Sequence, residues 1–179
     1  YYDSSFNNPN YLFMEVDYVD GLRKSYLLFK DNGSLQESGS YIDQNSISYK
    51  TYYSSSGQVY FKGKIQNGQH NGPYSRYNEN GQLMNEGQYL NNNYNGPQTY
   101  YDKEGKINSI EMFMDGRIIN SKGFYTDNRY RYTEFYGNEK IKFNGIYKDD
   151  EKDGVWMFYH ESGKRKEKQI FENGKLISY

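Results

Sequence analysis

The sequence contains no cysteine and no alanine among its 179 residues, and it has only one tryptophan. Without cysteine there is no disulfide, no thiolate nucleophile and no cysteine-based metal site. Alanine is the strongest helix former, so its absence disfavours helices. No apolar run approaches the roughly 20 residues that a membrane-spanning helix needs. We therefore expect a chain that is poor in helix and has no transmembrane segment.

Two features bear on the location of the protein. The sequence begins at Tyr1 rather than at a methionine, as it would after removal of a signal peptide or if it were a piece cut from a longer chain. A chain without cysteine also suits export. We therefore expect an exported or cell-surface protein rather than a cytoplasmic one.

The chain has almost no net charge, because 22 basic residues face 23 acidic ones and leave a balance of −1. Proteins that bind nucleic acid need a positive field to displace counterions from the phosphates. Membrane-surface binding through lipid headgroups calls for a polybasic segment. We expect neither nucleic acid nor a polybasic membrane anchor among the partners of this chain.

Aromatic residues are abundant: there are 23 tyrosines and 10 phenylalanines. Tyrosine can bury its ring while its hydroxyl stays near water, which suits a thin structure of half-covered side chains. Aromatic residues together with many Asn and Gly favour strands joined by tight turns. The composition thus indicates an all-β protein.

A repeat of 24 residues runs through the chain. Counted from its first glycine as position 0, the unit has an aromatic residue or Ile at position 2, Gly at 9, Tyr at 14, Gly at 18 and an aliphatic residue at 20. Such a period is the signature of a repeat architecture. The structural repeat positions are Gly39, Gly63, Gly87 and Gly145 at 0, Tyr53, Tyr77, Tyr101 and Tyr159 at 14, and Gly57, Gly81, Gly105 and Gly163 at 18.

The repeat predicts the organisation of the chain. Residues 1–10 are a polar leader, and residues 11–179 are a single repeat domain. Residues 111–122 interrupt the period, so we expect them to shift the register and to form a bend or an irregular strand pair. The units lie near 15–38, 39–62, 63–86, 87–110, 123–144 and 145–168, and a half unit covers 169–179.

Each unit is expected to supply two strands and two turns, which gives an elongated antiparallel array of β-hairpins. Asn-Gly and Asp-Gly pairs nucleate primed hairpin turns. The pairs in question are Asp20-Gly21, Asn32-Gly33, Asn80-Gly81, Asp115-Gly116 and Asn173-Gly174. Glycine at position 0 falls in mid-strand, where a close approach by another group is the usual reason to keep it. We predict that the ring at position 14 of a neighbouring strand lies over this glycine.

Two segments resemble the bacterial variant of the MORN repeat (membrane occupation and recognition nexus). The resemblance rests on Gly145, Tyr147, Gly154, Trp156, Tyr159 and Gly163, and on Gly63, Ile65, Gly72, Tyr74, Tyr77, Gly81 and Leu83. Tandem copies occur in the YwqK-type antitoxin family. The resemblance implies an elongated hairpin array that acts as a scaffold or binding surface, and a protein partner.

The sequence offers no catalytic constellation, no metal site and no cofactor motif. Only His70 and His160 could exchange protons near neutral pH, and both are expected to be solvated turn residues, since a catalytic histidine needs an orienting partner and a pocket. We therefore expect a protein that is not an enzyme.

Positions 11 and 13 of the units supply the candidate binding face. If the face is exposed, it forms an aromatic ladder of the residue types that dominate interfaces. If it is covered, the same residues are core, because few other apolar residues are available. The candidate residues are Tyr52, Tyr74, Arg76, Tyr100, Trp156 and Phe158. We expect a non-enzymatic MORN-like repeat module for protein–protein interaction, and the resemblance to the antitoxin family implies an antitoxin-like role. The alternative is extracellular carbohydrate or cell-wall binding through aromatic hairpins.

Overall fold

A computed structural model describes residues 11–43, 46–125 and 127–179; the predicted leader, residues 1–10, lies outside them. Every regular element in the described residues is a strand, and the strands form one open antiparallel meander in chain order. This confirms the predicted all-β array of hairpins. The chain divides into two compact units, of which the first ends at Asn93 and the second begins at Tyr94.

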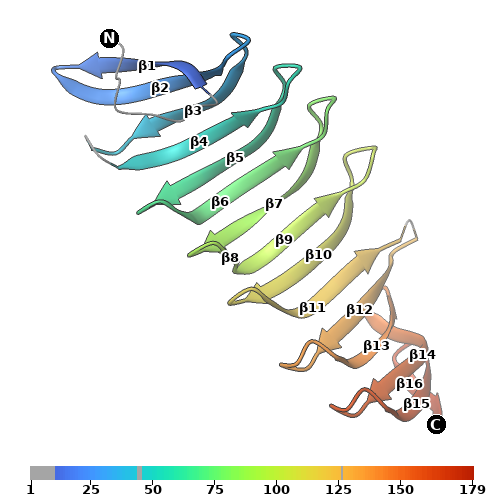
Figure 1. Cartoon of the computed structure of the whole chain (residues 1–179). Coiled ribbons are helices and arrows are strands. Elements are labelled where there is room, and N and C mark those ends of the chain that lie inside the picture. The colour runs from blue at the N-terminus through green and yellow to red at the C-terminus, as the bar shows by residue number, and fades with distance from the viewer. Residues whose placement is uncertain (1–10, 44–45, 126) are drawn as a thin grey trace. The chain divides into compact units, whose positions relative to one another are not determined.

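The strands of the first unit lie side by side in chain order (Figure 1). They are β1 (Tyr11–Val19), β2 (Leu22–Lys30), β3 (Leu35–Tyr41), β4 (Ile47–Tyr53), β5 (Val59–Gln66), β6 (Gln69–Tyr77) and β7 (Leu83–Leu90). The short β8 (Asn93–Tyr94) spans the boundary. The second unit holds β9 (Gly96–Tyr101), β10 (Ile107–Met114), β11 (Arg117–Phe124), β12 (Arg129–Phe135), β13 (Ile141–Lys148), β14 (Glu151–Tyr159), β15 (Arg165–Glu172) and β16 (Lys175–Ser178).

The hairpins close with two kinds of turn. Two-residue turns in which both residues have positive φ are of the primed type, and they confirm the prediction at Asp20-Gly21, Asp115-Gly116 and Asn173-Gly174. The prediction is wrong at Asn32-Gly33 and Asn80-Gly81, where only the glycine has positive φ. There the loop is one residue longer, and the glycine occupies the left-handed position of a bulge that follows an ordinary turn.

The bulged turn recurs at position 18 of the units. The Gly57 N–H donates to the Ser54 carbonyl at 3.0 Å, and the Ser54 N–H donates to the Gln58 carbonyl at 2.8 Å. The same pair of bonds forms at residues 78–82, 102–106 and 160–164. The glycine at position 18 is thus kept for its backbone conformation.

A ring covers the glycine at position 0, but it does not come from position 14. At Gly39 and Gly145 the ring comes from position 11, and at Gly63 the ring of Phe61, from the same strand, would stand 2.6 Å from an added Cβ. An added Cβ on Gly39 would stand 2.3 Å from the Tyr26 ring, and one on Gly145 would stand 2.2 Å from Trp156. Tyr74, also at position 11, pairs directly with Gly63 on one side and with Gly87 on the other.

The predicted role of position 14 is therefore wrong, because register decides which ring reaches the glycine. The tyrosines at position 14 stand next to the bulged turns, opposite position 20 of the same hairpin. Tyr53 pairs with Val59, and Tyr77 pairs with Leu83. They close the hairpin at its end, several residues away from the glycine in mid-strand.

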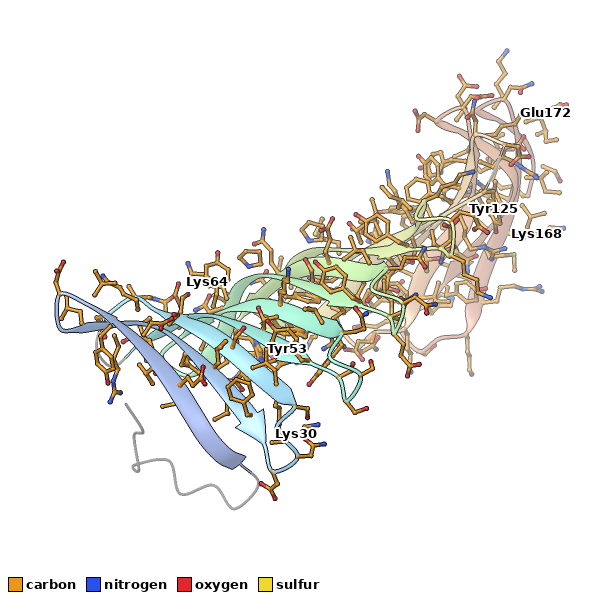
Figure 2. All side chains as sticks on the ribbon, turned by 90° about the horizontal axis from the view of Figure 1, so that it is seen from above. Lys30, Tyr53, Lys64, Tyr125, Lys168 and Glu172 are labelled. Carbon is orange, nitrogen blue, oxygen red and sulfur yellow. The ribbon has the colours of Figure 1, made fainter. Side chains whose placement is uncertain are left out.

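Within each unit the sheet is a single layer, and side chains stand on both of its faces (Figure 2). No helix or second sheet covers either face in the described residues. The core is therefore the row of rings and aliphatic side chains on one face. In the first unit it begins with the buried cluster of Met14, Val16, Tyr26 and Leu28. It continues with Phe61, Ile65 and Tyr74, which are 3–6% exposed.

The second unit gathers its rings around Trp156. Trp156 is fully buried and packs edge-on against Tyr147 and Phe171 at centroid distances of 5.0 and 6.2 Å. We call the group the Trp156 ring cluster; its members are Tyr130, Tyr132, Phe143, Tyr147, Trp156, Phe158 and Phe171.

Inside the second unit the repeat changes faces. Residues directly opposite in an antiparallel pair share a face. Gln98, at position 11, lies opposite Glu111, and Glu111 lies opposite Ser121. The next residue, Lys122, lies opposite Tyr132 of the Trp156 ring cluster. Since neighbouring residues of a strand point to opposite faces, Gln98 and the Trp156 ring cluster are on different faces.

The residues predicted as an insertion cause this change. Residues 111–122 complete β10, form the primed turn and supply most of β11, in a hairpin with one register shift. They add one strand to an array that otherwise advances two strands per unit. The following units then run in the reverse strand direction while the meander still grows along the chain. The strand direction is thus reversed while the direction of growth stays the same. Because the handedness of a hairpin is fixed, it can meet both conditions only by turning over, so that its ring face points to the other side of the sheet.

Candidate functional site

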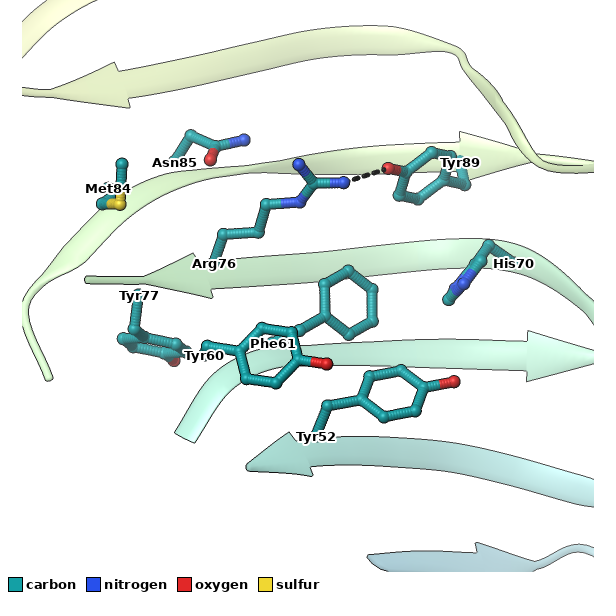
Figure 3. A pocket seen from close by; sticks show the side chains of 9 residues that line it. All are labelled: Tyr52, Tyr60, Phe61, His70, Arg76, Tyr77, Met84, Asn85 and Tyr89. Atoms are coloured by element: carbon teal, nitrogen blue, oxygen red, sulfur yellow. Dashed lines mark hydrogen bonds between the residues drawn. The ribbon is translucent and has the colours of Figure 1, made fainter. Parts of the chain in front are cut away.

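The candidate site is an open hollow of about 520 Å³ on the ring face of the first unit (Figure 3). Strands β4 to β7 contribute to it, so it does not depend on any loop. Its lining combines rings with one cation, one amide and one imidazole. The lining residues are Tyr52, Tyr60, Phe61, His70, Arg76, Tyr77, Met84, Asn85 and Tyr89.

Two β-bulges bring additional side chains to the hollow. Tyr52 pairs with Phe61 and Tyr53 pairs with Val59, so Tyr60 is the extra residue of β5. Met84 is the extra residue of β7 in the same way. A bulge redirects side chains that strict alternation would send to the opposite face. Tyr60 and Met84 are 47% and 50% exposed, and a ligand can reach both.

The floor of the hollow is a packed set of rings. Phe61 stacks on Tyr74 at a centroid distance of 5.9 Å, and Tyr74 lies 4.6 Å from Tyr89. The Arg76 guanidinium lies 5.9 Å above the Phe61 ring and 5.7 Å above the Tyr74 ring. It also donates to the Tyr89 hydroxyl at 3.1 Å. These contacts hold the guanidinium over the rings, at the surface of the hollow.

A second hollow of about 310 Å³ adjoins the first and shares Tyr52 and His70 with it. Its lining includes Lys50 and Ile65. Lys50 occupies position 11, where three other units carry the rings of Tyr26, Tyr74 and Trp156. Its Nζ lies 2.7 Å from the Glu37 carboxylate and 5.9 Å from the centre of the Tyr52 ring.

His70 stands where the two hollows meet. The prediction of a solvated turn residue is wrong, because His70 belongs to β6 and its ring packs between Phe61 and Tyr89 at 5.2 and 5.3 Å. Its Nδ1 is buried without a hydrogen-bond partner among the described residues. Burial lowers the pKa of His70 below 6.5, and the charges of Lys50 and Arg76 lower it further. The imidazole is therefore neutral at pH 7.

Two residues of the predicted binding face line the hollow, and a third, Tyr74, lies beneath it. Tyr52 and Arg76 line the hollow. Tyr74 and Trp156 are 3% and 0% exposed and belong to the core. The expectation of a single shared face does not hold in the second unit. There Tyr100 lies opposite Ser109, on the face of Gln98, whereas Trp156 and the half-buried Phe158 belong to the Trp156 ring cluster on the other face.

Sequence reasoning missed most of the lining. Tyr89 is at position 2 and Phe61 two residues before position 0, and both positions were available from the period. Asn85 holds the same position as Phe61 but has no ring, and His70 carried no signal because the units do not repeat it. Tyr60 and Met84 required knowledge of the bulges.

Two other sites in the second unit are less suited to a ligand. The Lys152 ammonium already lies 4.5 Å from the Trp156 ring centre and 4.7 Å from that of Phe171, so this aromatic cage is filled by the chain itself. A polar hollow of about 270 Å³ includes Glu111 and Arg131 on the opposite face. In the described residues, no group of three or more His, Asp or Glu is placed to hold a metal ion. No helix there is long and apolar enough to cross a membrane.

An open, single-layer array of β-hairpins with a ring-lined face defines the class as a β-hairpin repeat protein. The profile of the MORN repeat variant matches residues 71–91 and 152–173. These two segments are therefore similar to MORN repeats of this variant type. The first segment lies within the strands of the candidate site, and the second holds Lys152, Trp156 and Phe171.

Solved structures show more distant likeness. The chain is 10% identical to a chain of the GtfA/B complex bound to UDP and GlcNAc, with a TM-score of 0.36, and the match covers 82% of this chain and 26% of that one. It is 12% identical to a chain in the structure of accessory secretory protein 1,2 and 3 in Streptococcus pneumoniae, with a TM-score of 0.23 and coverages of 67% and 23%. The chain thus spans about a quarter of either. No curated protein sequence matches it.

Proposed function

We propose that the chain is a non-enzymatic module that binds another protein through the hollow on the ring face of its first unit. The observation that carries the proposal is the hollow itself, in which Tyr52, Tyr60 and Arg76 stand on strands of the sheet. Tyrosine and arginine are the residue types on which protein interfaces depend most, particularly when packing already holds them in place.

The lining supports binding rather than catalysis. General acid–base chemistry needs a proton-transferring group with an orienting partner. His70 is the only histidine of the hollow, and its Nδ1 has no partner among the described residues. No carboxylate side chain lines either hollow. The site therefore has rings and donors, but no paired acid and base.

Photo-crosslinking tests the proposal directly. Benzoylphenylalanine in place of Tyr60 should form a covalent adduct with a protein in cells of the organism that produces the chain. The matched control is Tyr49, which is 48% exposed against 47% for Tyr60 and precedes Lys50 on the opposite face. We expect a crosslinked protein when the probe is at position 60 and none when it is at position 49. The substitution Tyr52→Ser should lower the yield of the crosslink at position 60. Equal adducts at the two positions would contradict the proposal.

The resemblance to YwqK-type antitoxins supports a finer version, in which the bound protein is a toxin that this chain neutralises. In that case the crosslinked protein is a toxin, and co-expression of the chain with this toxin restores the growth of cells that the toxin otherwise inhibits. Carbohydrate binding is the competing outcome. A glycan array with strong binding, together with no protein adduct at Tyr60, would replace the proposal with that alternative.

A further inference from the structure

The two hollows of the first unit have a lining of one charge sign. Lys50, Arg76 and His70 line them, and no Asp or Glu side chain of the described residues does. Glu37 shares this face through its pairing with Tyr52. It is 8% exposed and already accepts bonds from the Tyr26 hydroxyl and the Lys50 ammonium. A ligand therefore meets hydrogen-bond donors and cations on this face, together with rings.

The two cations act on one point. Lys50 belongs to the smaller hollow and Arg76 to the larger one. Both nevertheless lower the pKa of His70, which stands between the hollows. A shift of this sign means that both charges disfavour a further positive charge at the imidazole. The same two charges attract a negative group placed there.

The length of the hollows suits an extended segment of chain. Tyr60 lines the larger hollow and Asn67 the smaller one, and the two residues are joined by β5. Seven residue steps at about 3.3 Å span roughly 23 Å. An extended peptide of about seven residues covers that distance, and its side chains on one face recur about every 7 Å.

We propose that the occupant is an extended acidic segment of a partner protein. One carboxylate lies beside His70, between Lys50 and Arg76, and an aromatic or aliphatic side chain enters each hollow. The inference rests on the proposed function and specifies the chemistry of the partner. A peptide fits better than an anionic membrane because the two hollows offer only two cations, Lys50 and Arg76, whereas headgroup binding uses a cluster of basic residues.

Blocked heptapeptides test the inference on the full chain. One set carries Glu or Asp at the fourth position and Phe, Tyr or Leu at the second and sixth. The matched set carries Gln or Asn at the fourth. By fluorescence anisotropy at about 50 mM salt, the acidic set should bind about tenfold more tightly, because charge-assisted bonds are stronger than neutral ones. The preference should shrink at about 0.5 M salt.

Arg76→Gln should reduce the preference for the acidic set to less than about threefold. The matched control is Lys62→Gln, an equal loss of charge at an exposed residue. Lys62 pairs with Thr51, which places it on the opposite face, so this variant should keep the preference.

Equal binding of the two peptide sets, or a preference that Arg76→Gln leaves intact, would overturn the inference. Binding to phosphatidylserine vesicles but not to phosphatidylcholine vesicles or to either peptide set would also overturn it. A protein adduct at Tyr60 without any acidic preference would leave the proposed function standing and reject only the acidic partner. Absence of both the adduct and the peptide binding would reject the two together.

Discussion

The indole of Trp156 covers Gly145 so closely that an added Cβ would stand 2.2 Å from its Cδ2 atom. Gly145→Ala must therefore displace either the ring or the strand, and overpacking of this kind costs about 1–3 kcal/mol. We expect the free energy of unfolding to fall by this amount. Urea unfolding measures it through the fluorescence of Trp156, the only tryptophan of the sequence.

Gly123→Ala is the control for that measurement. Gly123 lies in β11 of the same unit, its φ is not positive, and an added Cβ would meet nothing within 4 Å. Its cost should stay within about 0.5 kcal/mol. Equal losses for the two variants would contradict the role assigned to the ring.

The ion pair of Lys50 and Glu37 predicts a compensating pair of variants. Lys50→Met removes the ion-pair partner of the Glu37 carboxylate, which is 8% exposed, and leaves it the hydrogen bond from the Tyr26 hydroxyl. We expect a loss of about 1–3 kcal/mol, less than for a fully buried pair because the Lys50 side chain is 22% exposed. Glu37→Leu combined with Lys50→Met should recover most of it.

Urea unfolding of the single and double variants forms a double-mutant cycle that isolates the pair. A double variant that is less stable than Lys50→Met alone would show that Lys50 stabilises the fold by packing rather than by its charge. The Tyr26 hydroxyl provides a second measurement. Burial is the main reason why the pKa of this hydroxyl lies far above 10. The hydrogen bond to Glu37 and the negative charge of Glu37 raise it further. Its ultraviolet titration should move towards lower pH in Glu37→Leu.

His70 predicts how stability depends on pH. Its pKa in the folded chain lies below 6.5, so the unfolded chain takes up this proton first as the pH falls. The free energy of unfolding should therefore decrease as the pH falls below about 6.5, until the folded imidazole is protonated as well. His70→Phe should remove this part of the dependence between pH 7 and 5. Direct titration of the imidazole by NMR provides the check, and a midpoint at or above 6.5 would contradict the assignment.

Glu139 occupies the left-handed position of a bulged turn, with φ of 64°. Other bulged turns place glycine there, as at Gly81 and Gly163. Because a side chain in this conformation costs about 1 kcal/mol, Glu139→Gly should stabilise the chain by that amount in thermal or urea unfolding. Glu161→Gly is the control, since Glu161 lies in the next bulged turn without positive φ. It removes the same charge and should not stabilise the chain.

Much of the fold was predictable because its causes are local. The recurring glycines and rings predicted two strands per unit. The primed turns at Asp20-Gly21 and Asp115-Gly116 follow from the two turn residues alone. The candidate site was predictable only in part. Tyr52 and Arg76 repeat at position 13, whereas His70 is peculiar to one unit and has no sequence signal.

The sequence by itself determined an all-β hairpin array with mid-strand glycines under rings, because backbone conformation and strand alternation depend on neighbours in the chain. Only the tertiary structure decided which ring covers each glycine: cross-strand register places Tyr26 opposite Gly39, whereas the ring over Gly63 is that of Phe61 from the same strand. It also decided the side on which each aromatic row stands. One added strand reverses the direction of those that follow, and a hairpin of fixed hand must then present its other face.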